Sequence, residues 1–224
     1  KPRRKERCPS LQPFPDRRGD VDLPLVPNLT HAQTNAMREL LRIAPVIDDL
    51  GRLFSHAGHE IYLVGGSVRD ALLGVLGDDL DFTTSARPEE THALLRQFTP
   101  STWDIGKEFG TIGAMKRADG HDWKIEVTTF RADIYRSSSR KPDVAFGDTI
   151  DGDLSRRDFT VNAMAINVAT RQFVDPYGGL TDLADGILRT PSTPERSFSD
   201  DPLRMMRAAR FASRLGFAVA PEVV

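Results

Sequence analysis

The sequence predicts a mixed α/β fold, with a small mixed sheet flanked by helices and followed by the start of an all-helical domain. Two observations support this prediction. Between residues 30 and 188, short apolar runs typical of strands alternate with segments whose apolar residues recur at helical spacing. After Ser199 no strand pattern returns, and a helical segment rich in arginine occupies the end of the chain.

Composition and charge narrow the class of protein. The 224 residues carry a formal net charge of −2, so bulk charge does not mark a nucleic-acid binder. A single cysteine, Cys8, excludes an intrachain disulfide, and the five histidines lack the spacing of zinc ligands. No apolar run approaches the ~18 residues of a membrane span, and the N-terminus lacks the apolar segment of a signal peptide. We therefore expect a cytoplasmic protein.

The N-terminal segment differs from the rest of the chain. Residues 1–29 are rich in proline and arginine and have no apolar period, so we expect a disordered basic arm. Such an arm could contact RNA, and a solvated tail without a role is the alternative. The folded part is therefore expected to begin near residue 30.

The remaining elements are predicted from local patterns. A helix begins at Thr30, with Pro45 kinking or splitting it and Gly58 ending it. The helix over 67–74 is expected to be capped by Ser67 and closed by Gly74. Another helix is predicted over 88–97, and DFTVNAMAINVAT (158–170) is read as a helix that runs into a strand. Strands are predicted for EIYLVGG (60–66), DLDFTT (79–84), TIGAMKR (111–117), KIEVTTFR (124–131) and RQFVDP (171–176).

The segment SDDPLRMMRAARFASRLG (199–216) has the start and stop signals of a helix. Ser199 is the expected cap, Pro202 lies early in the segment, and Gly216 ends it. Its arginines lie on or near one side, while most of its apolar residues lie on the others. We expect a second, helical domain to begin here and most of it to lie beyond Val224.

Two carboxylates lie on one face of a predicted strand. Asp79 and Asp81 project together because side chains alternate along a strand, and Glu126 stands on the polar side of another strand. Converging carboxylates raise each other's pKa unless cations hold them, and such oxygen ligands suit Mg²⁺. The alternative is that these acids are solvated residues at strand ends.

A phosphate-binding turn precedes these acids. In VGGSVRD (64–70), Gly65 and Gly66 lie between a strand and a helix N-terminus, where backbone N–H groups can approach a phosphate. Arg69 adds a side chain suited to bidentate contact with phosphate oxygens. A phosphate-binding turn beside a metal-ligand pair predicts a nucleotide site.

Six motifs occur in order between about residues 60 and 217: YLVGGSVRDALLG, DLDF, EVTTFR, RRDFTVNAMA, DPYGG and DDPLRMMRAARF. Together they resemble the bacterial tRNA nucleotidyltransferase and poly(A) polymerase family, which belongs to the polymerase-β-like nucleotidyltransferases. The resemblance implies a catalytic head over 30–188 and the beginning of a helical neck over 189–224. It also implies transfer of CMP and AMP from CTP and ATP to the 3′ end of tRNA, with release of pyrophosphate.

The resemblance also implies roles for individual residues. Asp79 and Asp81 would bind two Mg²⁺ ions, with Glu126 as the third catalytic carboxylate. Arg157 would contact the triphosphate. Asp158 and Asn162 would close the pocket, although Asp158 also reads as a helix N-cap. The motif DPYGG (175–179) supplies a tight turn, for which a structural role is expected.

Base recognition without a template is expected on the last helix. Asp201 and Arg204 lie at i, i+3 and are therefore neighbours. Cytosine and adenine both present an amine beside an acceptor ring nitrogen, which a carboxylate and a guanidinium complement. By resemblance, Asp201 and Arg204 read this edge, while Arg207 and Arg210 support nucleotide binding. The family's usual Glu-Asp pair is Asp200-Asp201 here, and a solvated basic helix face is the alternative reading.

Several functions remain open at this point. A poly(A) polymerase would carry a basic GRRF stretch where this chain has DIGKEFGT (104–111), which resembles the CCA-adding type. A CC-only enzyme would differ mainly in loops, and RADIYRSSSRKPD (131–143) is expected to be a mobile loop or a plain surface loop. A noncatalytic nucleotide- or RNA-binding module is the alternative from another class.

Overall fold

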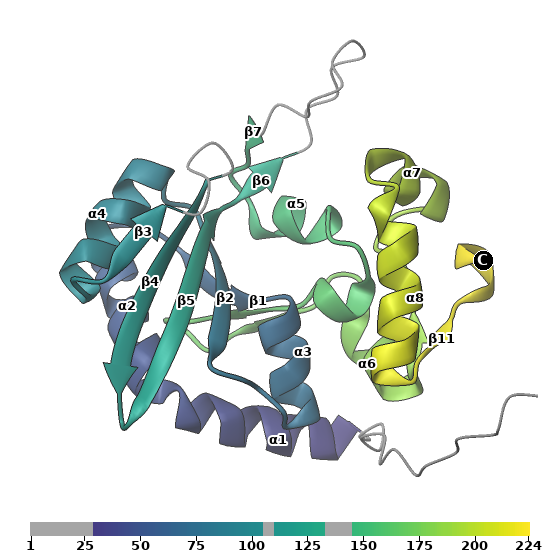
Figure 1. Ribbon diagram of the computed structural model, residues 1–224, viewed down its shortest axis with the longest axis horizontal. Helices are drawn as coiled ribbons and strands as arrows, with labels where there is room; N and C mark the ends of the chain where they lie inside the picture. Colours follow the sequence, from purple (N-terminus) through teal and green to yellow (C-terminus); the bar gives the residue numbers. More distant parts are fainter. Residues whose placement is uncertain (1–28, 105–109, 133–144) are drawn as a thin grey trace, which may run out of the picture.

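The computed structural model describes residues 29–104, 110–132 and 145–224. Within these residues, seven strands form one mixed sheet in the order β3-β4-β5-β2-β1-β8-β9 (Figure 1). This arrangement confirms the mixed α/β class that the sequence predicts. The strands of this sheet are β1 (Ile61–Val64), β2 (Asp79–Thr84), β3 (Thr102–Asp104), β4 (Thr111–Ala118), β5 (His121–Thr129), β8 (Ala165–Asn167) and β9 (Phe173–Val174).

Helices and two short strand pairs complete the described fold. The strand pairs are β6 (Arg131–Ala132) with β7 (Ala145–Phe146), and β10 (Ile187–Leu188) with β11 (Ala218–Val219). The α-helices are α1 (Leu29–Arg42), α2 (Ala44–His56), α3 (Gly66–Leu73), α4 (Pro88–Phe98), α5 (Ile150–Ser155), α6 (Gly179–Asp185), α7 (Pro194–Asp200) and α8 (Leu203–Leu215). The 3₁₀ turns are η2 (Thr160–Asn162) and η3 (Pro221–Val223). None of the described helices combines the length and apolar character that a membrane crossing requires.

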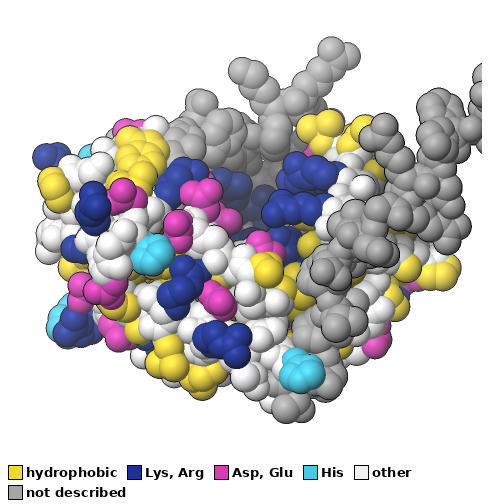
Figure 2. Space-filling view, turned by 60° about the horizontal axis from the view of Figure 1, so that its bottom comes forward, with side chains coloured by type: hydrophobic (Ala, Val, Ile, Leu, Met, Phe, Trp, Pro, Cys, Tyr) yellow, Lys and Arg dark blue, Asp and Glu magenta, His cyan; other side chains and the backbone are white. Residues whose placement is uncertain are grey.

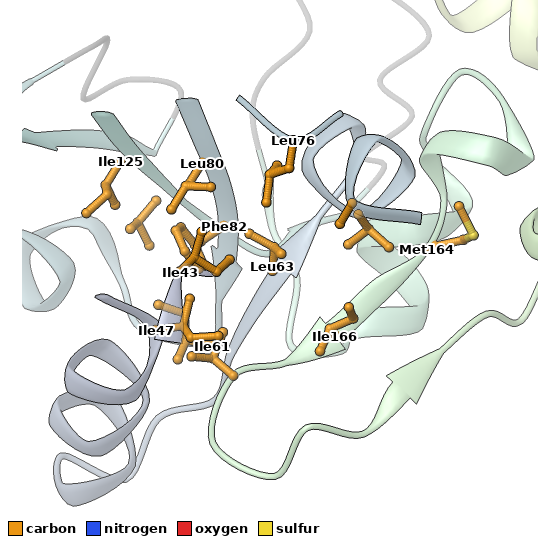
Figure 3. Packing of buried hydrophobic residues seen from close by; sticks show 14 of the residues in the cluster. Ile43, Ile47, Ile61, Leu63, Leu76, Leu80, Phe82, Ile125, Met164 and Ile166 are labelled. Carbon is orange, nitrogen blue, oxygen red and sulfur yellow. The ribbon is translucent and has the colours of Figure 1, made fainter. Parts of the chain in front are cut away.

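The main core lies between the sheet and the helices α2 and α4. Figure 3 shows Ile43 and Ile47 pointing towards Leu63 and Phe82 of the sheet. Side chains point alternately to the two faces of the sheet along β1. Ile61 and Leu63 therefore join this core, whereas Tyr62 and Val64 belong to a second apolar cluster on the opposite face. On that opposite side α5 contributes the buried Leu154. The sheet is therefore covered on both faces near β1.

The helix predicted from Thr30 is split, as the proline suggested. Helix α1 ends at Arg42 and α2 begins at Ala44, with Pro45 in its first turn, where the missing N–H costs no hydrogen bond. Gly74 and Gly216 both adopt the left-handed conformation at helix ends, with φ of 75° and 70°. These two helix stops confirm the predictions made from the glycines.

Two predicted helix caps are wrong. Helix α3 begins at Gly66 with Gly65 as its N-cap, so Ser67 lies inside the helix and its hydroxyl accepts a hydrogen bond from the Asp81 N–H at 2.9 Å. Ser199 lies inside α7, because the chain breaks into two helices around Asp201 and Pro202 rather than forming one. Pro202 can start α8 because its φ of −60° suits a helix and it needs no donor there.

Two further predictions are corrected. A strand does follow the last helix, since β11 pairs in parallel with β10, which precedes α7. The predicted helix over 158–170 is reduced to the 3₁₀ turn η2, and β8 supplies the predicted strand. The basic arm, most of the 131–143 loop and most of the 104–111 stretch lie outside the described residues.

Candidate active site

The predicted carboxylates lie on one face of two adjacent parallel strands. In β2, Asp79 and Asp81 are exposed whereas Leu80 and Phe82 are each 1% exposed. Strand β5 runs parallel to β2, and Glu126 is the register partner of Asp81. The prediction that the three carboxylates share one face is therefore confirmed for this chain's geometry.

A lysine that the sequence analysis did not single out lies among these acids. Lys124 is the register partner of Asp79, and its Nζ lies 2.8 Å from Glu126 Oε1 and 3.6 Å from Asp79 Oδ1. The hydrogen bond to Glu126 raises the pKa of Lys124, and the nearby Asp79 charge adds to this effect. Because Lys124 precedes Glu126 by two residues, strand alternation alone could have identified it.

The environment of Asp81 suits a cation. Partial burial raises the pKa of Asp81, and the neighbouring Glu126 and Asp79 charges raise it further, while Arg157 and Lys124 oppose the effect. Asp81 nevertheless stays accessible to water, because it faces an open cavity rather than the core. The positive charges of Arg157 and Lys124 therefore offset only part of what disfavours the ionised carboxylate of Asp81.

The carboxylates of Asp79, Asp81 and Glu126 can supply some of the oxygen ligands that a hard divalent cation needs. Among the described residues, no group of three or more His, Cys, Asp or Glu is close enough to hold a metal ion by itself. Mg²⁺ needs only one or two carboxylates when substrate phosphates and water supply its other oxygens. The pair of Asp79 and Asp81, with Glu126 beside Asp81, meets that requirement.

The Gly-Gly turn leaves room for a guanidinium. Gly65 has a φ of 65°, and a Cβ built on it would lie 2.7 Å from Arg157 Nη1. Only glycine combines this backbone conformation with that close approach. Gly66 starts α3, so the turn presents the N-terminus of α3 towards Arg157.

Arg69 is more buried than a simple phosphate ligand would be. Its side chain is 4% exposed, donates to Asn162 Oδ1 at 2.5 Å and pairs with Asp70 at 2.7 Å. It still borders the large cavity described next. Arg69 therefore ties α3 to η2 as well as facing the site.

A cavity of about 480 Å³ collects every residue predicted to bind nucleotide. Residues between 65 and 162 and residues between 201 and 214 both contribute to it, and Figure 2 shows basic side chains gathered around a hollow of the surface, with acidic ones beside them. The predicted residues along it are Gly65, Gly66, Arg69, Arg157, Asp158, Asn162, Asp201, Arg204, Arg207 and Arg210. Asp81 also lines this cavity, so a nucleotide held there would reach one carboxylate of the pair.

The other two predicted carboxylates lie outside this cavity. Glu126 lines an adjacent cavity of about 240 Å³, which shares Asp81, Arg131, Arg156 and Arg157 with the larger one. Asp79 lines neither of the two, and its side chain is 77% exposed. Asp81 is therefore the predicted carboxylate that lines both cavities.

Asp158 links α8 to the 3₁₀ turn η2. Its Oδ2 accepts a hydrogen bond from Arg207 Nε at 2.7 Å and forms an ion pair with Arg207 Nη2 at 2.6 Å, and its Oδ1 accepts from Asn162 Nδ2 and from the Phe159 N–H. The N-cap of η2 is Phe159, so the alternative prediction that Asp158 is a helix N-cap is wrong. Asp158 is instead a buried acceptor that joins Arg207 to Asn162.

The sequence analysis missed three arginines and one aromatic residue at this cavity. Burial lowers the pKa of Arg131, as does the nearby Arg156 charge, while Asp153 opposes them. The ring centroid of the buried Phe211 lies 5.3 Å from Arg69 Cζ, 5.5 Å from Arg207 Cζ and 5.2 Å from Arg210 Cζ. The missed residues are Arg131, Arg156, Arg214 and Phe211. Arg131 ends the motif EVTTFR, Arg156 begins RRDFTVNAMA and Arg214 continues the arginine row, whereas nothing in the local pattern marks Phe211.

Comparison with known proteins gives one family and many relatives. Residues 61–189 match the family described as "Poly A polymerase head domain". The CCA-adding enzyme of Streptococcus pneumoniae (strain ATCC BAA-255 / R6) is 44% identical over 190 residues, which is 84% of this chain and 44% of that protein. The CCA-adding enzyme of Ligilactobacillus salivarius is 40% identical over 186 residues, or 83% of this chain and 43% of that protein. The chain therefore spans less than half the length of these curated relatives.

Two solved structures have a similar fold. The Bacillus stearothermophilus CCA-adding enzyme in complex with CTP has a TM-score of 0.67 and 39% identity, covering 81% of this chain and 41% of that one. The Thermotoga maritima CCA-adding enzyme complexed with tRNA has a TM-score of 0.63 and 32% identity, covering 80% and 39% of the two chains. The resemblance drawn from the six motifs is thereby confirmed.

Proposed function

This chain belongs to the poly(A) polymerase head-domain family, and we propose that it carries the catalytic head of a CCA-adding tRNA nucleotidyltransferase. The reaction is the transfer of CMP and AMP from CTP and ATP to the 3′ end of tRNA, with release of pyrophosphate. One observation carries the proposal: the ten residues predicted to bind nucleotide line a single cavity, and Asp81 lies in its wall. The names of the relatives favour CCA addition over the alternatives.

The family uses divalent metal ions, and the proposal is that two Mg²⁺ ions are held by Asp79 and Asp81, with Glu126 as a third carboxylate. When bound, such ions lower the pKa of the RNA 3′-hydroxyl and stabilise the charge on the leaving pyrophosphate. The raised pKa of Asp81 supports this assignment, because burial and the neighbouring Glu126 and Asp79 charges both disfavour its ionised carboxylate, which a bound cation would stabilise.

The chain's own residues bind and orient the substrates. The N–H groups after the Gly-Gly turn and the guanidinium of Arg157 face the same cavity, where they hold the triphosphate. Arg207 and Arg210 add positive charge from α8. These contacts place the α-phosphorus beside Asp81, while the RNA end approaches through the smaller cavity that Glu126 lines.

Base selection comes from Asp201 and Arg204 in this proposal. The carboxylate accepts from the amine of cytosine or adenine, and the guanidinium donates to the ring nitrogen beside it. Uracil and guanine present the opposite pattern and would leave both protein groups unsatisfied, which discriminates strongly in a desolvated site. The Leu203 N–H donates to Asp201 Oδ1 at 3.0 Å, and the other oxygen, Oδ2, is the one that accepts from the base in this proposal.

The proposed domain division follows from the same reading. Residues 30–188 form the catalytic head, and 189–224 begin the neck that supplies base recognition. A cytoplasmic location belongs to this proposal because tRNA is the substrate.

Single-nucleotide extension tests the function. tRNA transcripts that end before CCA, after C and after CC are each incubated with one labelled NTP and Mg²⁺, with Asp79→Ala as the inactive control. Incorporation of C, C and then A supports the proposal. Arrest after CC indicates a CC-only enzyme, and long A tracts indicate a poly(A) polymerase.

A second measurement addresses the length of the chain. Metal-dependent binding of CTP, measured by calorimetry, tests the nucleotide site without requiring tRNA. If CTP binds but nothing is incorporated, the site is present and parts of the longer relatives are needed for RNA. If CTP does not bind, the proposed function is wrong.

A further inference from the structure

Arg204 is held at two points by groups outside its own helix. Its Nη1 donates to Ser197 Oγ at 2.8 Å, and its Nη2 donates to the backbone carbonyl of Arg156 at 2.6 Å. Ser197 belongs to α7, and Arg156 follows α5 in the head. Two acceptors from different elements therefore fix the plane of one guanidinium.

Ser197 is well placed to act as a rigid acceptor. The residue is 0% exposed, and its backbone N–H donates to the Thr193 carbonyl at 2.9 Å. Its own carbonyl accepts from the Asp201 N–H at 3.3 Å. Ser197 thus contacts the side chain of Arg204 and the backbone of Asp201, the two residues that face the base in the proposed function.

The direction of the guanidinium matters for selectivity. A guanidinium carries only donors, so one that rotates freely can also donate to the carbonyl oxygens of uracil or guanine. Held in one plane, it donates towards a fixed point, and a base with a protonated nitrogen there is rejected. Preorganised side chains of this kind need support from neighbouring residues.

We propose that Ser197 is a positioning residue for base selection, whose hydroxyl holds the Arg204 guanidinium for the Watson–Crick edge shared by cytosine and adenine. This inference rests on the proposed function for the role of Arg204. Nothing in the local sequence pattern marks Ser197, because the contact joins two helices across the break at Asp201 and Pro202.

The test compares Ser197→Ala with Ser199→Ala. Ser199 lies in the same helix but is exposed, so its variant controls for loss of a hydroxyl from α7. Binding constants for CTP, ATP, UTP and GTP are measured by calorimetry with the whole 224-residue chain. Ser197→Ala is expected to lower the preference for CTP over UTP about three- to tenfold, since a hydrogen bond to a charged group is lost. Ser199→Ala is expected to leave the preference unchanged.

A second variant guards against a packing defect. Ser197→Cys keeps the side-chain volume but offers a much weaker acceptor, so it should lower the preference in the same way as Ser197→Ala. Unchanged preference in a folded Ser197→Cys variant overturns the inference. An equal loss of affinity for all four nucleotides also overturns it, because that result indicates a purely structural role.

A measurement that needs no nucleotide tests this inference independently of the proposed function. Rotation about the Nε–Cζ bond of Arg204 is followed by NMR of the guanidinium nitrogens, with the signals assigned by Arg204→Lys. Slow rotation in the wild type that becomes fast in Ser197→Ala supports the inference. It does so even if the wild type shows no preference for CTP, because that second result counts only against the proposed function. Equal rotation in both proteins overturns the inference.

Discussion

Lys124 and Glu126 form an ion pair within the carboxylate site, with 2.8 Å between Nζ and Oε1. Lys124 also approaches Asp79, so one ammonium group partly offsets the acids of both strands. A divalent cation held by the same carboxylates would compete with Lys124 for them. The Lys124 side chain can move away from these carboxylates into solvent, since 41% of it is exposed.

Replacement of Lys124 is therefore expected to strengthen metal binding. In Lys124→Met the carboxylates lose a competing cation, and the affinity for Mn²⁺ should rise about two- to fivefold, the range expected for an exposed ion pair. Electron paramagnetic resonance of free Mn²⁺ measures this directly. Lys116→Met removes the same charge from β4, where Lys116 Nζ donates to the Phe98 carbonyl, and serves as the control. Equal affinities in Lys124→Met and the wild type would contradict the expected competition.

The raised pKa of Asp81 predicts a pH-dependent effect on stability. The folded chain takes up a proton at Asp81 at a higher pH than the unfolded chain does, so the ionised carboxylate destabilises the metal-free fold at neutral pH. Asp81→Asn should raise the unfolding midpoint there. The gain should shrink as the pH falls through the raised pKa and vanish below the ordinary carboxyl range.

Thermal unfolding in chelator at several pH values checks this expectation. Leu80→Met, a volume-conserving change at the neighbouring buried position, controls for general effects of substitution in β2. The same Asp81→Asn variant should lose nucleotide transfer. A gain in stability that does not vary with pH would count against the electrostatic cause.

Gly65→Ala should harm both the fold and the nucleotide site. The added Cβ would lie 2.7 Å from Arg157 Nη1 and would also strain a backbone with φ of 65°. We expect a loss of about 1–3 kcal/mol in the free energy of unfolding from the strain alone, together with weaker CTP binding as Arg157 is displaced.

Gly58→Ala is the matched control for this change. Gly58 has a φ of 81°, and a Cβ there would meet nothing within 4 Å. It should reproduce the backbone strain without affecting CTP binding. Denaturant unfolding and calorimetry on both variants separate the two effects, and equal CTP affinities would show that Arg157 does not depend on Gly65.

Phe211→Leu should weaken both nucleotide binding and the fold. The ring contacts three guanidiniums that line the cavity, and each cation–π contact contributes about 0.5–1 kcal/mol. Leucine retains much of the apolar burial but none of these contacts, so we expect the unfolding midpoint to fall by a few degrees and CTP affinity to fall about three- to tenfold as the arginines lose their support. Phe217→Leu, at a similarly buried position, is the control. A parallel loss in both variants would assign Phe211 to packing alone.

Much of the fold and the candidate site could be predicted because its signals are local. The shared face of Asp79 and Asp81 follows from strand alternation, and the split at Pro45 follows from the chemistry of proline. The predicted caps at Ser67 and Ser199 were wrong because each serine lies within a helix that begins earlier. Local cap signals cannot show which of several possible starts the packed chain adopts.

The sequence by itself determined the fold class, the carboxylate pair, the Gly-Gly turn and the arginine row, since each depends on residues within a few positions of one another. Only the tertiary structure decided that β5 lies parallel to β2, which sets Glu126 and Lys124 beside the carboxylate pair. It also decided that Phe211 of α8 contacts Arg69 of α3 and that Ser197 holds Arg204. These contacts join different helices and strands, and such pairings depend on how the apolar faces pack against one another, which periodicity along the chain does not specify.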